Sequence, residues 1–525
     1  MVRGQKMTDW SDGYVTEVDY TYGFYKEMAP VAMRFALLAA GLEAPPLDKF
    51  NYCELGFGQG AGLNLLAAAN PQGDFWGTDF NPAHAAGAMQ LASAAGLTNL
   101  HAFDDSFEQF AARDLPKFDY ITLHGVWSWV GAENCRHIVD FIHKHLKVGG
   151  VVYVSYNTLP GWTHALPMRG LLIQYVEYQT APADSMASRL DEALKLLSKL
   201  NEIPGSYFKL TPQLAERIKA LQGQNRNYLA HEYLNRHWTP VFFSQMVEAL
   251  EAAKLTFAAH ANPMNCIDAL NHTKELQAVL DEITNPIFKE VVRDLGINQT
   301  FRRDLFMRGP RRLSRSDHTA GLLETTYALV VERSACSMKV KTTVGEASLQ
   351  PAVYEPILDK LASGGPIVGR ELLNLPEMAQ AGGAPRLMQA LMVLVGAGYV
   401  QPCVPAPLQE AARASTARFN NSTMARTARG GEANFTFLAS PRLGSGVVQT
   451  RLPQLYLQAL QARPKASVLA LSRSVWSVLR TSGQGLVKDG KQIKGDEASV
   501  QELVTRIGEW LKANLELARH IELLP

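Results

Sequence analysis

The sequence lacks three features that would each have pointed to a class of proteins. Its five cysteines lie at positions 53, 135, 266, 336 and 403. Their number is odd and no two form a CxxC pair, so they indicate neither a disulfide framework nor a zinc site. No apolar run approaches the ~20 residues of a membrane span. The first residues, MVRGQKMTDWSDGY, lack the apolar core of a signal peptide. We therefore expect a soluble, cytoplasmic protein without a metal.

Net charge of one sign is also missing, because 51 basic and 50 acidic residues leave a formal net charge of +1. Near-neutrality argues against a global field for nucleic acids or anionic membranes and leaves room only for a local patch. Six arginines gather at 302, 303, 308, 311, 312 and 315. Contact with phosphate is one interpretation of this cluster, but a strand followed by a solvated link explains it more often.

The sequence does contain an alternation of strand-like and helix-like segments. The strands are expected at 50–55, 74–79, 99–103, 118–123 and 151–156, and the helices at 61–69, 82–95, 106–113 and 133–146. This order predicts an α/β fold with a parallel, doubly wound, Rossmann-like sheet. Residues 160–236 then read as helical, and we expect them to form an insertion that caps the site. Segments 237–260 and 300–309 are expected to complete the sheet with a helix and two further strands.

The remaining residues suggest further divisions. We expect an N-terminal lid segment and helix at 1–45, the domain with the sheet at 46–310, and a winged-helix-like α+β domain at 311–405. A linker rich in Ala, Ser, Thr, Arg and Gly and a C-terminal helical domain are expected at 406–525. The winged-helix-like region is poor in Lys and Arg, which favours protein docking over DNA. The aromatic and acidic segment 14–25 fits either a lid or a surface lead-in.

The segment Glu54-Leu55-Gly56-Phe57-Gly58-Gln59-Gly60 follows a predicted strand and precedes a predicted helix. Glycines in such a loop allow a tight turn and let backbone amides approach a ligand. A glycine trio alone is a weak signal, because dinucleotide enzymes use similar loops. The acidic residue at the strand end suits a cationic amino group better than a pyrophosphate. S-adenosylmethionine carries such a group, so Glu54, Gly56, Gly58 and Gly60 are predicted to bind it.

Two acidic residues follow the next two strands. Asp79, with Phe80 beside it, lies 19 residues beyond Gly60, where a carboxylate can accept hydrogen bonds from both ribose hydroxyls. Asp105 and Ser106 follow the third strand, where this fold usually holds the adenine. Each aspartate could instead cap the helix that follows it. The succession of strands and loops favours the cofactor-binding interpretation for the set as a whole.

Strands four and five both end in aromatic loops. One loop contains His124, Trp127 and Trp129, and the other contains Tyr156 and Trp162. At the carboxyl edge of the sheet these rings would line a channel for a methyl acceptor. The alternative, packing against the helical insertion, is weighed equally for Trp129 and Trp162 and less for Trp127 and Tyr156. Trp127, Tyr156 and His124 are our candidate catalytic residues.

The motifs ELGFGQG, GTDFNP, HGVWSWV and SYNTLPGW resemble those of bacterial class I methyltransferases that carry a methyltransferase regulatory domain. The resemblance covers about 10–310, with the regulatory segment at about 211–300, and implies S-adenosylmethionine as the methyl donor. The rickettsial protein-lysine methyltransferases that modify outer-membrane protein share this architecture, which implies a lysine of a protein as the acceptor. Phe57 departs from the family pattern, where a smaller residue is common.

Three functions remain open from the sequence: a protein methyltransferase, a methyltransferase acting on small molecules or lipids, and a non-catalytic scaffold that binds the cofactor. No nucleic acid partner is expected, and the oligomeric state is left open. Methyl transfer depends mainly on the alignment of acceptor, methyl carbon and sulfur. Tyr156, His124 or Glu17 would take the acceptor's proton through water. We expect no single essential base and only a modest rate loss in each variant.

Overall fold

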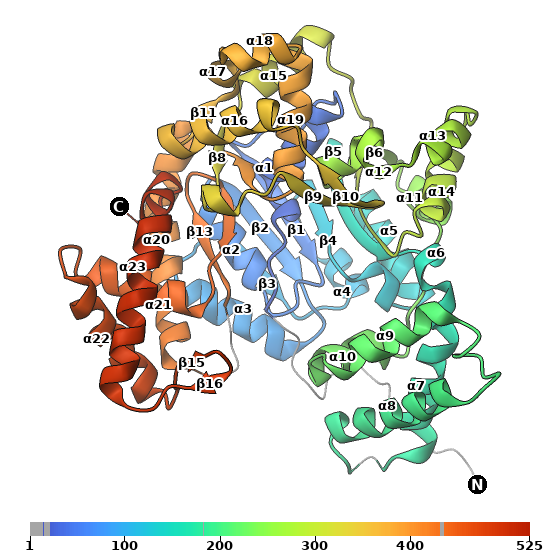
Figure 1. Cartoon of the computed structure of the whole chain (residues 1–525). Coiled ribbons are helices and arrows are strands. Elements are labelled where there is room, and N and C mark those ends of the chain that lie inside the picture. Colours follow the sequence, from blue (N-terminus) through green and yellow to red (C-terminus); the bar gives the residue numbers. More distant parts are fainter. Residues whose placement is uncertain (1–13, 15–21, 182, 431–434, 525) are drawn as a thin grey trace.

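The computed structural model describes residue 14 and residues 22–181, 183–430 and 435–524 (Figure 1). Glu17, named above for proton transfer, lies outside the described residues, as do Asp19 and Tyr20 of the N-terminal segment. Over the described ranges, no helix combines the length and the apolar character that crossing a membrane requires.

A seven-stranded sheet forms the centre of the molecule (Figure 1). Its strands are β1 (Phe50–Leu55), β2 (Gly73–Thr78), β3 (Leu100–Phe103), β4 (Phe118–Leu123), β5 (Leu146–Asn157), β6 (Thr256–His260) and β7 (Phe301–Met307). The spatial order is β3-β2-β1-β4-β5-β7-β6, and only β7 runs antiparallel to its neighbours. The predicted doubly wound sheet is confirmed, including its closure by the two late strands.

Helices cover both faces of this sheet because successive strand residues point to opposite sides. Tyr52 and Tyr153 pack against α1 (Pro30–Ala39), α2 (Ala61–Ala69) and α3 (Pro82–Ala94). Cys53 and Val154 pack against α4 (Phe107–Ala112), α5 (Ala132–His145) and α11 (Phe243–Glu251). The carboxyl ends of β1, β2, β4 and β5 therefore meet at one edge of the sheet, where ligands bind in such folds.

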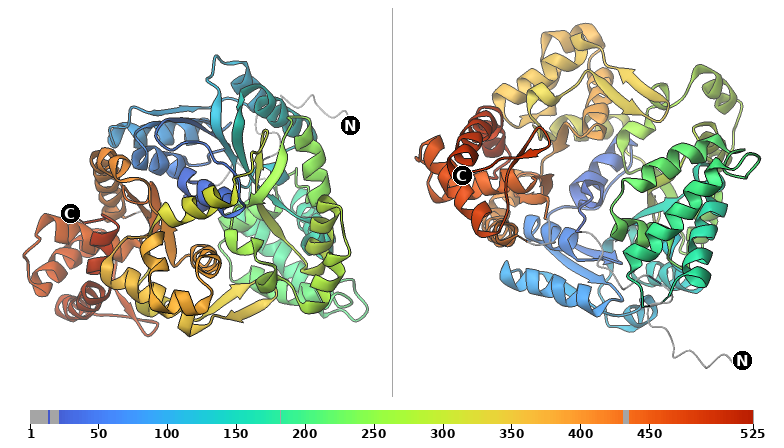
Figure 2. Two further views of the ribbon diagram at one scale, coloured as in Figure 1. Left: turned by 90° about the horizontal axis from the view of Figure 1, so that it is seen from above. Right: turned by 60° about the horizontal axis from the view of Figure 1, so that its bottom comes forward.

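Helices occupy the chain between β5 and β6. Before α11, they are α6 (Leu159–Trp162), α7 (Leu166–Gln179), α8 (Met186–Glu202), α9 (Pro212–Gln222) and α10 (Arg226–Tyr233). Trp162, Leu194 and Tyr233 belong to an apolar core of their own. Figure 2 shows this group and the C-terminal region on opposite sides of the sheet. Three more helices, α12 (Asp268–Asn271), α13 (Lys274–Asp281) and α14 (Pro286–Gly296), lie between β6 and β7.

The C-terminal region begins with α15 (Arg315–Glu324). A small sheet with the order β11-β8-β12 follows, formed by β8 (Thr326–Leu329), β11 (Ile367–Val368) and β12 (Val400–Pro402). Its helices are α16 (Pro351–Gly364), α17 (Gly369–Leu373), α18 (Pro376–Ala381) and α19 (Ala384–Gly396). Within its described residues, three separate hairpins also lie in this region: β9 (Lys339–Thr342) with β10 (Gly345–Ser348), β13 (Phe437–Ser440) with β14 (Ser445–Val448), and β15 (Val487–Lys488) with β16 (Lys491–Gln492). The last helices are α21 (Arg451–Ala462), α22 (Val468–Thr481) and α23 (Asp496–His520).

The expected linker after residue 405 is a helix instead, α20 (Ala406–Arg429). Its composition is polar, but one face is buried against α2 and the β13 strand. The Ser415 hydroxyl donates to the Ala68 carbonyl, the Thr416 hydroxyl donates back to Ala412, and Phe419 is fully buried. The segment contains no glycine, and tertiary packing of its buried face stabilises a helix that its many Ser, Thr and Asn residues do not indicate.

Candidate active site

The loop between β1 and α2 requires glycine at three positions. Gly56, Gly58 and Gly60 have φ angles of +73°, +57° and +68°. Residues other than glycine rarely adopt this left-handed backbone conformation. Space is short as well: a Cβ on Gly56 would lie 2.5 Å from a Val126 methyl, and a Cβ on Gly60 would lie 2.4 Å from the Ala88 Cβ. The glycines therefore hold the loop close to β4 and α3, at the edge of the sheet.

Two carboxylates flank this loop. Asp79, at the end of β2, accepts the Gly58 backbone N–H at 2.8 Å and the Asn81 N–H at 3.1 Å. Its Oδ1 also lies 3.0 Å from Nδ1 of His84, on α3. Glu54 is 7% exposed, and burial, reinforced by Asp79, raises its pKa to about 8. The sequence analysis did not single out His84, which lies in the first turn of α3.

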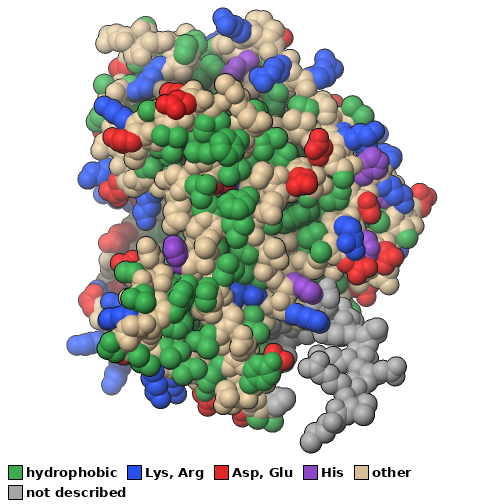
Figure 3. Space-filling model, turned by 90° about the vertical axis from the view of Figure 1, so that its right-hand side faces the viewer, with side chains coloured by type: hydrophobic (Ala, Val, Ile, Leu, Met, Phe, Trp, Pro, Cys, Tyr) green, Lys and Arg blue, Asp and Glu red, His purple; other side chains and the backbone are tan. Residues whose placement is uncertain are grey.

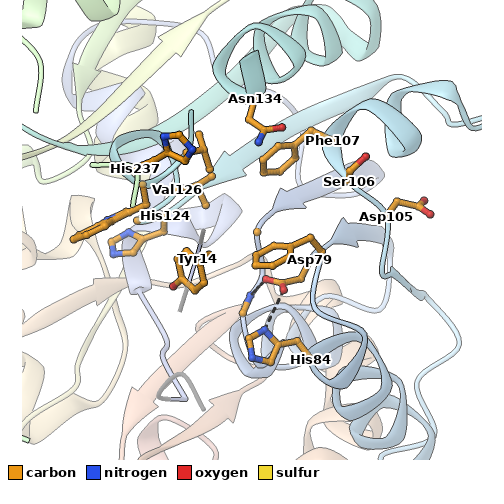
Figure 4. A pocket seen from close by; sticks show the side chains of 16 residues that line it. Tyr14, Asp79, His84, Asp105, Ser106, Phe107, His124, Val126, Asn134 and His237 are labelled. Atoms are coloured by element: carbon orange, nitrogen blue, oxygen red, sulfur yellow. Dashed lines mark hydrogen bonds and ion pairs between the residues drawn. The ribbon is translucent and has the colours of Figure 1, made fainter. Parts of the chain in front are cut away.

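An open cavity with an empty volume of about 960 Å³ lies over this edge (Figure 4). Among the residues predicted to bind the cofactor, its lining includes Gly56, Gly58, Asp79, Phe80, Asp105 and Ser106. Further lining residues are Tyr14, His84, Phe107, His124, Gly125, Val126, Trp129, Val130, Asn134 and His237. Residues from six separate stretches of the chain thus converge on one cavity, as expected for a ligand site.

A second, smaller cavity adjoins the first and has an empty volume of about 530 Å³. Glu54 lines it together with Gly23, Phe24, Tyr25 and Met28. Gly56, Gly58 and His124 line both cavities. The carboxylate of Glu54 therefore faces one side of the glycine loop, while Asp79 faces the other.

His124 lies at the junction of the two cavities. Its Nδ1 is 2.8 Å from the Tyr153 hydroxyl, and the Tyr25 ring stacks on it with 3.4 Å between centroids. Burial, with the nearby charge of Arg303, lowers its pKa to about 3. The imidazole is therefore neutral at physiological pH. With Nδ1 bonded to Tyr153, Nε2 is the ring nitrogen that a substrate can reach.

In the loop after β3, the Phe107 ring is directed into the cavity, whereas the carboxylate of Asp105 is occupied by another partner. The Asp105 carboxylate forms an ion pair with Arg113. The Ser106 hydroxyl caps α4 in a reciprocal pair with Gln109. Figure 4 shows Asp105 directed away from the cavity and Phe107 directed into it. Ser106 is thus the helix cap that the sequence had considered for Asp105, and cofactor binding by Asp105 and Ser106 stays a prediction.

The structure does not bring Trp127 and Tyr156 to the cavity wall. Trp127, in a 3-10 turn (Trp127–Trp129), is 6% exposed and packs in the core beneath the sheet edge. Tyr156 is 1% exposed, and its hydroxyl donates to Asp304 at 2.6 Å. Trp129 lines the cavity and contacts Trp238, whereas Trp162 packs within the helical insertion. Of the three candidate catalytic residues, only His124 lines the larger cavity.

S-adenosylmethionine fits the groups that are present. The Glu54 Oε2 atom is buried, and the described residues provide no hydrogen bond to it. A buried carboxylate oxygen without a partner is costly, and a ligand's ammonium group would satisfy it. Asp79 offers a carboxylate on the other side of the loop, and Phe80 and Phe107 provide flat apolar surfaces in the larger cavity. Glu54 thus suits the amino acid end of S-adenosylmethionine, and Asp79 with the two phenylalanines suits its nucleoside end.

We expect binding of the cofactor to strengthen as the pH rises toward 8. Because the pKa of Glu54 is about 8 before the ligand binds, its carboxyl is mostly protonated at pH 6. A ligand ammonium favours the ionised form, so each pH unit below that value costs up to about tenfold in affinity. Calorimetry with S-adenosylhomocysteine from pH 6 to 8.5 measures this slope. Glu54→Gln should flatten it, and equal slopes in both proteins would contradict the assignment.

Comparison with protein families gives two matches. Residues 53–152 match a methyltransferase domain, and residues 225–308 match a predicted methyltransferase regulatory domain. An uncharacterized protein of Synechocystis sp. is 40% identical over 495 residues, which cover 94% of this chain and 96% of that protein. A tRNA (guanine-N(7)-)-methyltransferase of Yersinia pseudotuberculosis is 29% identical over 174 residues, which cover 32% of this chain and 67% of that protein.

Among solved structures, PKMT2 from Rickettsia typhi in complex with AdoHcy has a similar fold. The TM-score is 0.70 at 19% identity, and the match covers 94% of this chain and 99% of that one. The similarity therefore extends beyond the central sheet to the C-terminal region. At this level of identity it establishes the fold and leaves the chemistry to the site itself.

Proposed function

The chain belongs to the S-adenosylmethionine-dependent methyltransferases that carry a predicted methyltransferase regulatory domain, and from this premise we propose that it methylates lysine side chains of a protein, such as an outer-membrane protein. The observation that carries the proposal is the neutral, buried His124 at the junction of two cavities. One cavity fits the nucleoside end of the donor and the other its amino acid end. The part of the larger cavity beside Trp129, called its aromatic side below, remains for the methyl acceptor.

We assign the donor's contacts to residues on either side of the glycine loop. Glu54 would bind the amino group, Asp79 the ribose hydroxyls, and Phe80 and Phe107 the adenine. The donor supplies a methyl group that its sulfonium charge has already activated. The protein's own task is then to hold an acceptor in line with that methyl group and to keep water away from both.

A lysine acceptor must lose a proton before it can react. At pH 7 a side chain with a pKa of ~10.4 pays about 4.6 kcal/mol for this loss. Desolvation beside Trp129 and Val130 lowers that cost, because burial disfavours the charged amine. The neutral His124, held by Tyr153, is placed to accept a hydrogen bond from the amine, while water takes the proton. None of these groups has to act as the only base.

A protein acceptor also suits the outer surface of the molecule. Figure 3 shows the face formed by the helical insertion and the segment between β6 and β7, where hydrophobic side chains are spread among charges of both signs. Exposed hydrophobic residues on these elements include Tyr178, Tyr207, Phe288 and Leu295. Among the described residues on this face, Lys and Arg form no continuous stripe of the kind that favours RNA binding. It offers instead the mixed surface on which polypeptides dock.

The proposal is tested by following labelled methyl groups. The full-length protein is incubated with methyl-labelled S-adenosylmethionine and cell-envelope protein, and the products are divided into protein, organic extract and RNA. We expect label in protein, located on lysine by mass spectrometry and lost when the lysines are acetylated beforehand. Label in the organic extract would favour a lipid or small-molecule acceptor, and label in RNA a nucleic acid. No label in any fraction would favour a non-catalytic scaffold.

A further inference from the structure

Residues 22–28, called the strap below, form one wall of the smaller cavity. Gly23, Phe24, Tyr25 and Met28 line this cavity opposite Glu54. The strap is held to the domain core at its end, where the Tyr52 hydroxyl donates to the Met28 carbonyl at 3.3 Å. Any ligand group that binds Glu54 therefore lies against the strap, and the position of the strap sets the width of this cavity.

The outer side of the strap packs against the β13–β14 part of the C-terminal region, more than four hundred residues later in the chain. The ring of Tyr22 lies 4.5 Å from that of Phe435, and the ring of Phe24 lies 5.5 Å from that of Phe437, measured between centroids. A Cβ on Gly446, in β14, would lie 3.0 Å from the Phe24 ring. The β13–β14 hairpin thus approaches the strap as closely as its backbone allows.

Lys26 makes the polar contact between the strap and the C-terminal region. Its ammonium donates to the Val395 carbonyl at 3.2 Å, near the end of α19, where a helix attracts cations. Burial lowers the pKa of Lys26; the Glu27 carboxylate opposes this shift and the Arg303 charge adds to it. On the next residue, the Glu27 carboxylate pairs with Arg303 of β7 at 3.4 Å. The strap is therefore fixed between the regulatory segment and the C-terminal region.

We propose that the C-terminal region is a working part of the cofactor site: α19 and the β13–β14 hairpin hold the strap against the smaller cavity, and Lys26 is the positioning residue. The C-terminal region sets the affinity for the cofactor without touching it. Tyr25 extends the effect to the acceptor side, because its ring stacks on His124. The inference rests on the proposed placement of the cofactor's amino acid end beside Glu54.

The test compares three lysine variants of the full chain. Lys26→Met keeps the aliphatic stem and removes the bond to Val395, whereas Lys26→Arg retains a donor. Lys360→Met changes an exposed lysine of α16 and serves as the matched control. We expect Lys26→Met to weaken binding of S-adenosylhomocysteine by about five- to twentyfold in calorimetry, which is less than the full loss of one hydrogen bond from a charged group because the effect reaches the cofactor only through the strap. Lys26→Arg should restore most of the affinity, and Lys360→Met should bind like the wild type.

Wild-type affinity in Lys26→Met would overturn the inference. If Lys26→Met fails to fold, Tyr22→Leu takes its place, because this variant removes the ring contact with Phe435. It should show the same loss of affinity, and wild-type affinity in Tyr22→Leu would then overturn the inference. Glu54→Gln separates the two proposals. A loss of binding in Glu54→Gln without a loss in the strap variants would refute the positioning role alone. Unchanged binding in Glu54→Gln would instead refute the placement of the cofactor.

Discussion

Replacing Asp79 by alanine should weaken the binding of S-adenosylmethionine by about a hundredfold or more. The carboxylate is assigned two hydrogen bonds to the ribose, and bonds to a charged group contribute about 1.5–3 kcal/mol each. Their loss, about 3 kcal/mol or more, corresponds to roughly a hundredfold in affinity. The variant also leaves the Gly58 N–H and the His84 ring without their present partner, which loosens the glycine loop.

One effect of Asp79→Ala acts in the opposite direction. The Asp79 carboxylate raises the pKa of Glu54, so its removal lets Glu54 ionise more readily and recovers a small part of the affinity. Asp104→Ala, at an exposed aspartate two strands from the glycine loop, is the matched control and should leave binding unchanged. Calorimetry at pH 9, one unit above the pKa of Glu54 in the wild type, isolates the ribose contribution because Glu54 is then largely ionised in both proteins. Equal affinity of Asp79→Ala and the wild type would refute the ribose assignment.

The largest expected effect on stability comes from Arg302. This arginine is 2% exposed on β7 and forms ion pairs with Asp304 at 2.7 Å, Asp294 at 2.7 Å and Glu290 at 3.0 Å. Its neighbours hold its own pKa above the usual value, although burial alone would lower it. Burial raises the pKa of Asp294 to about 6 despite the opposing charge of Arg302. Removing the guanidinium leaves three carboxyl groups in a site that excludes water.

We therefore expect Arg302→Met to lower the free energy of unfolding by about 3–5 kcal/mol, the range for a buried ion pair that loses one partner. Arg311→Met, from the same arginine cluster, changes a side chain that is 81% exposed and pairs with Glu43, and it should cost less than about 1 kcal/mol. Thermal unfolding followed by circular dichroism compares the two. If both variants unfold at the wild-type temperature, the network adds nothing to stability.

The sequence allowed the sheet to be predicted because its signals are local. β1 and β4 begin and end at the predicted residues, and α2 occupies 61–69 as expected. The positive φ angles of the glycine loop follow from glycine spacing after a strand. The sequence did not reveal α20, because its stability comes from contact with α2, far away in the chain. It also could not show that Arg302 is buried while Arg311 is exposed, since that depends on the helices placed over β7.

The position of a side chain relative to the glycine loop could be predicted where the backbone decides which way the residue points. Asp79 ends a strand, so its side chain had to lie near the glycine loop. Within HGVWSWV, by contrast, a 3-10 turn sends Trp127 into the core and leaves Trp129 at the cavity. Tyr156 alternates with Ser155 on β5 and points to the covered face of the sheet, toward Asp304. No sequence pattern indicated the 3-10 turn at Trp127–Trp129. Nor did any pattern indicate that the strap contacts Phe435 and Phe437.

The most direct test of the account is a crystal structure of the protein with S-adenosylhomocysteine. We predict that its amino group binds the Glu54 carboxylate beneath the strap, that both ribose hydroxyls bind Asp79, and that the adenine lies between Phe80 and Phe107. The sulfur should then face His124 and the aromatic side of the larger cavity. A ligand bound away from the glycine loop, or one whose amino group and ribose contact neither Glu54 nor Asp79, would contradict the account.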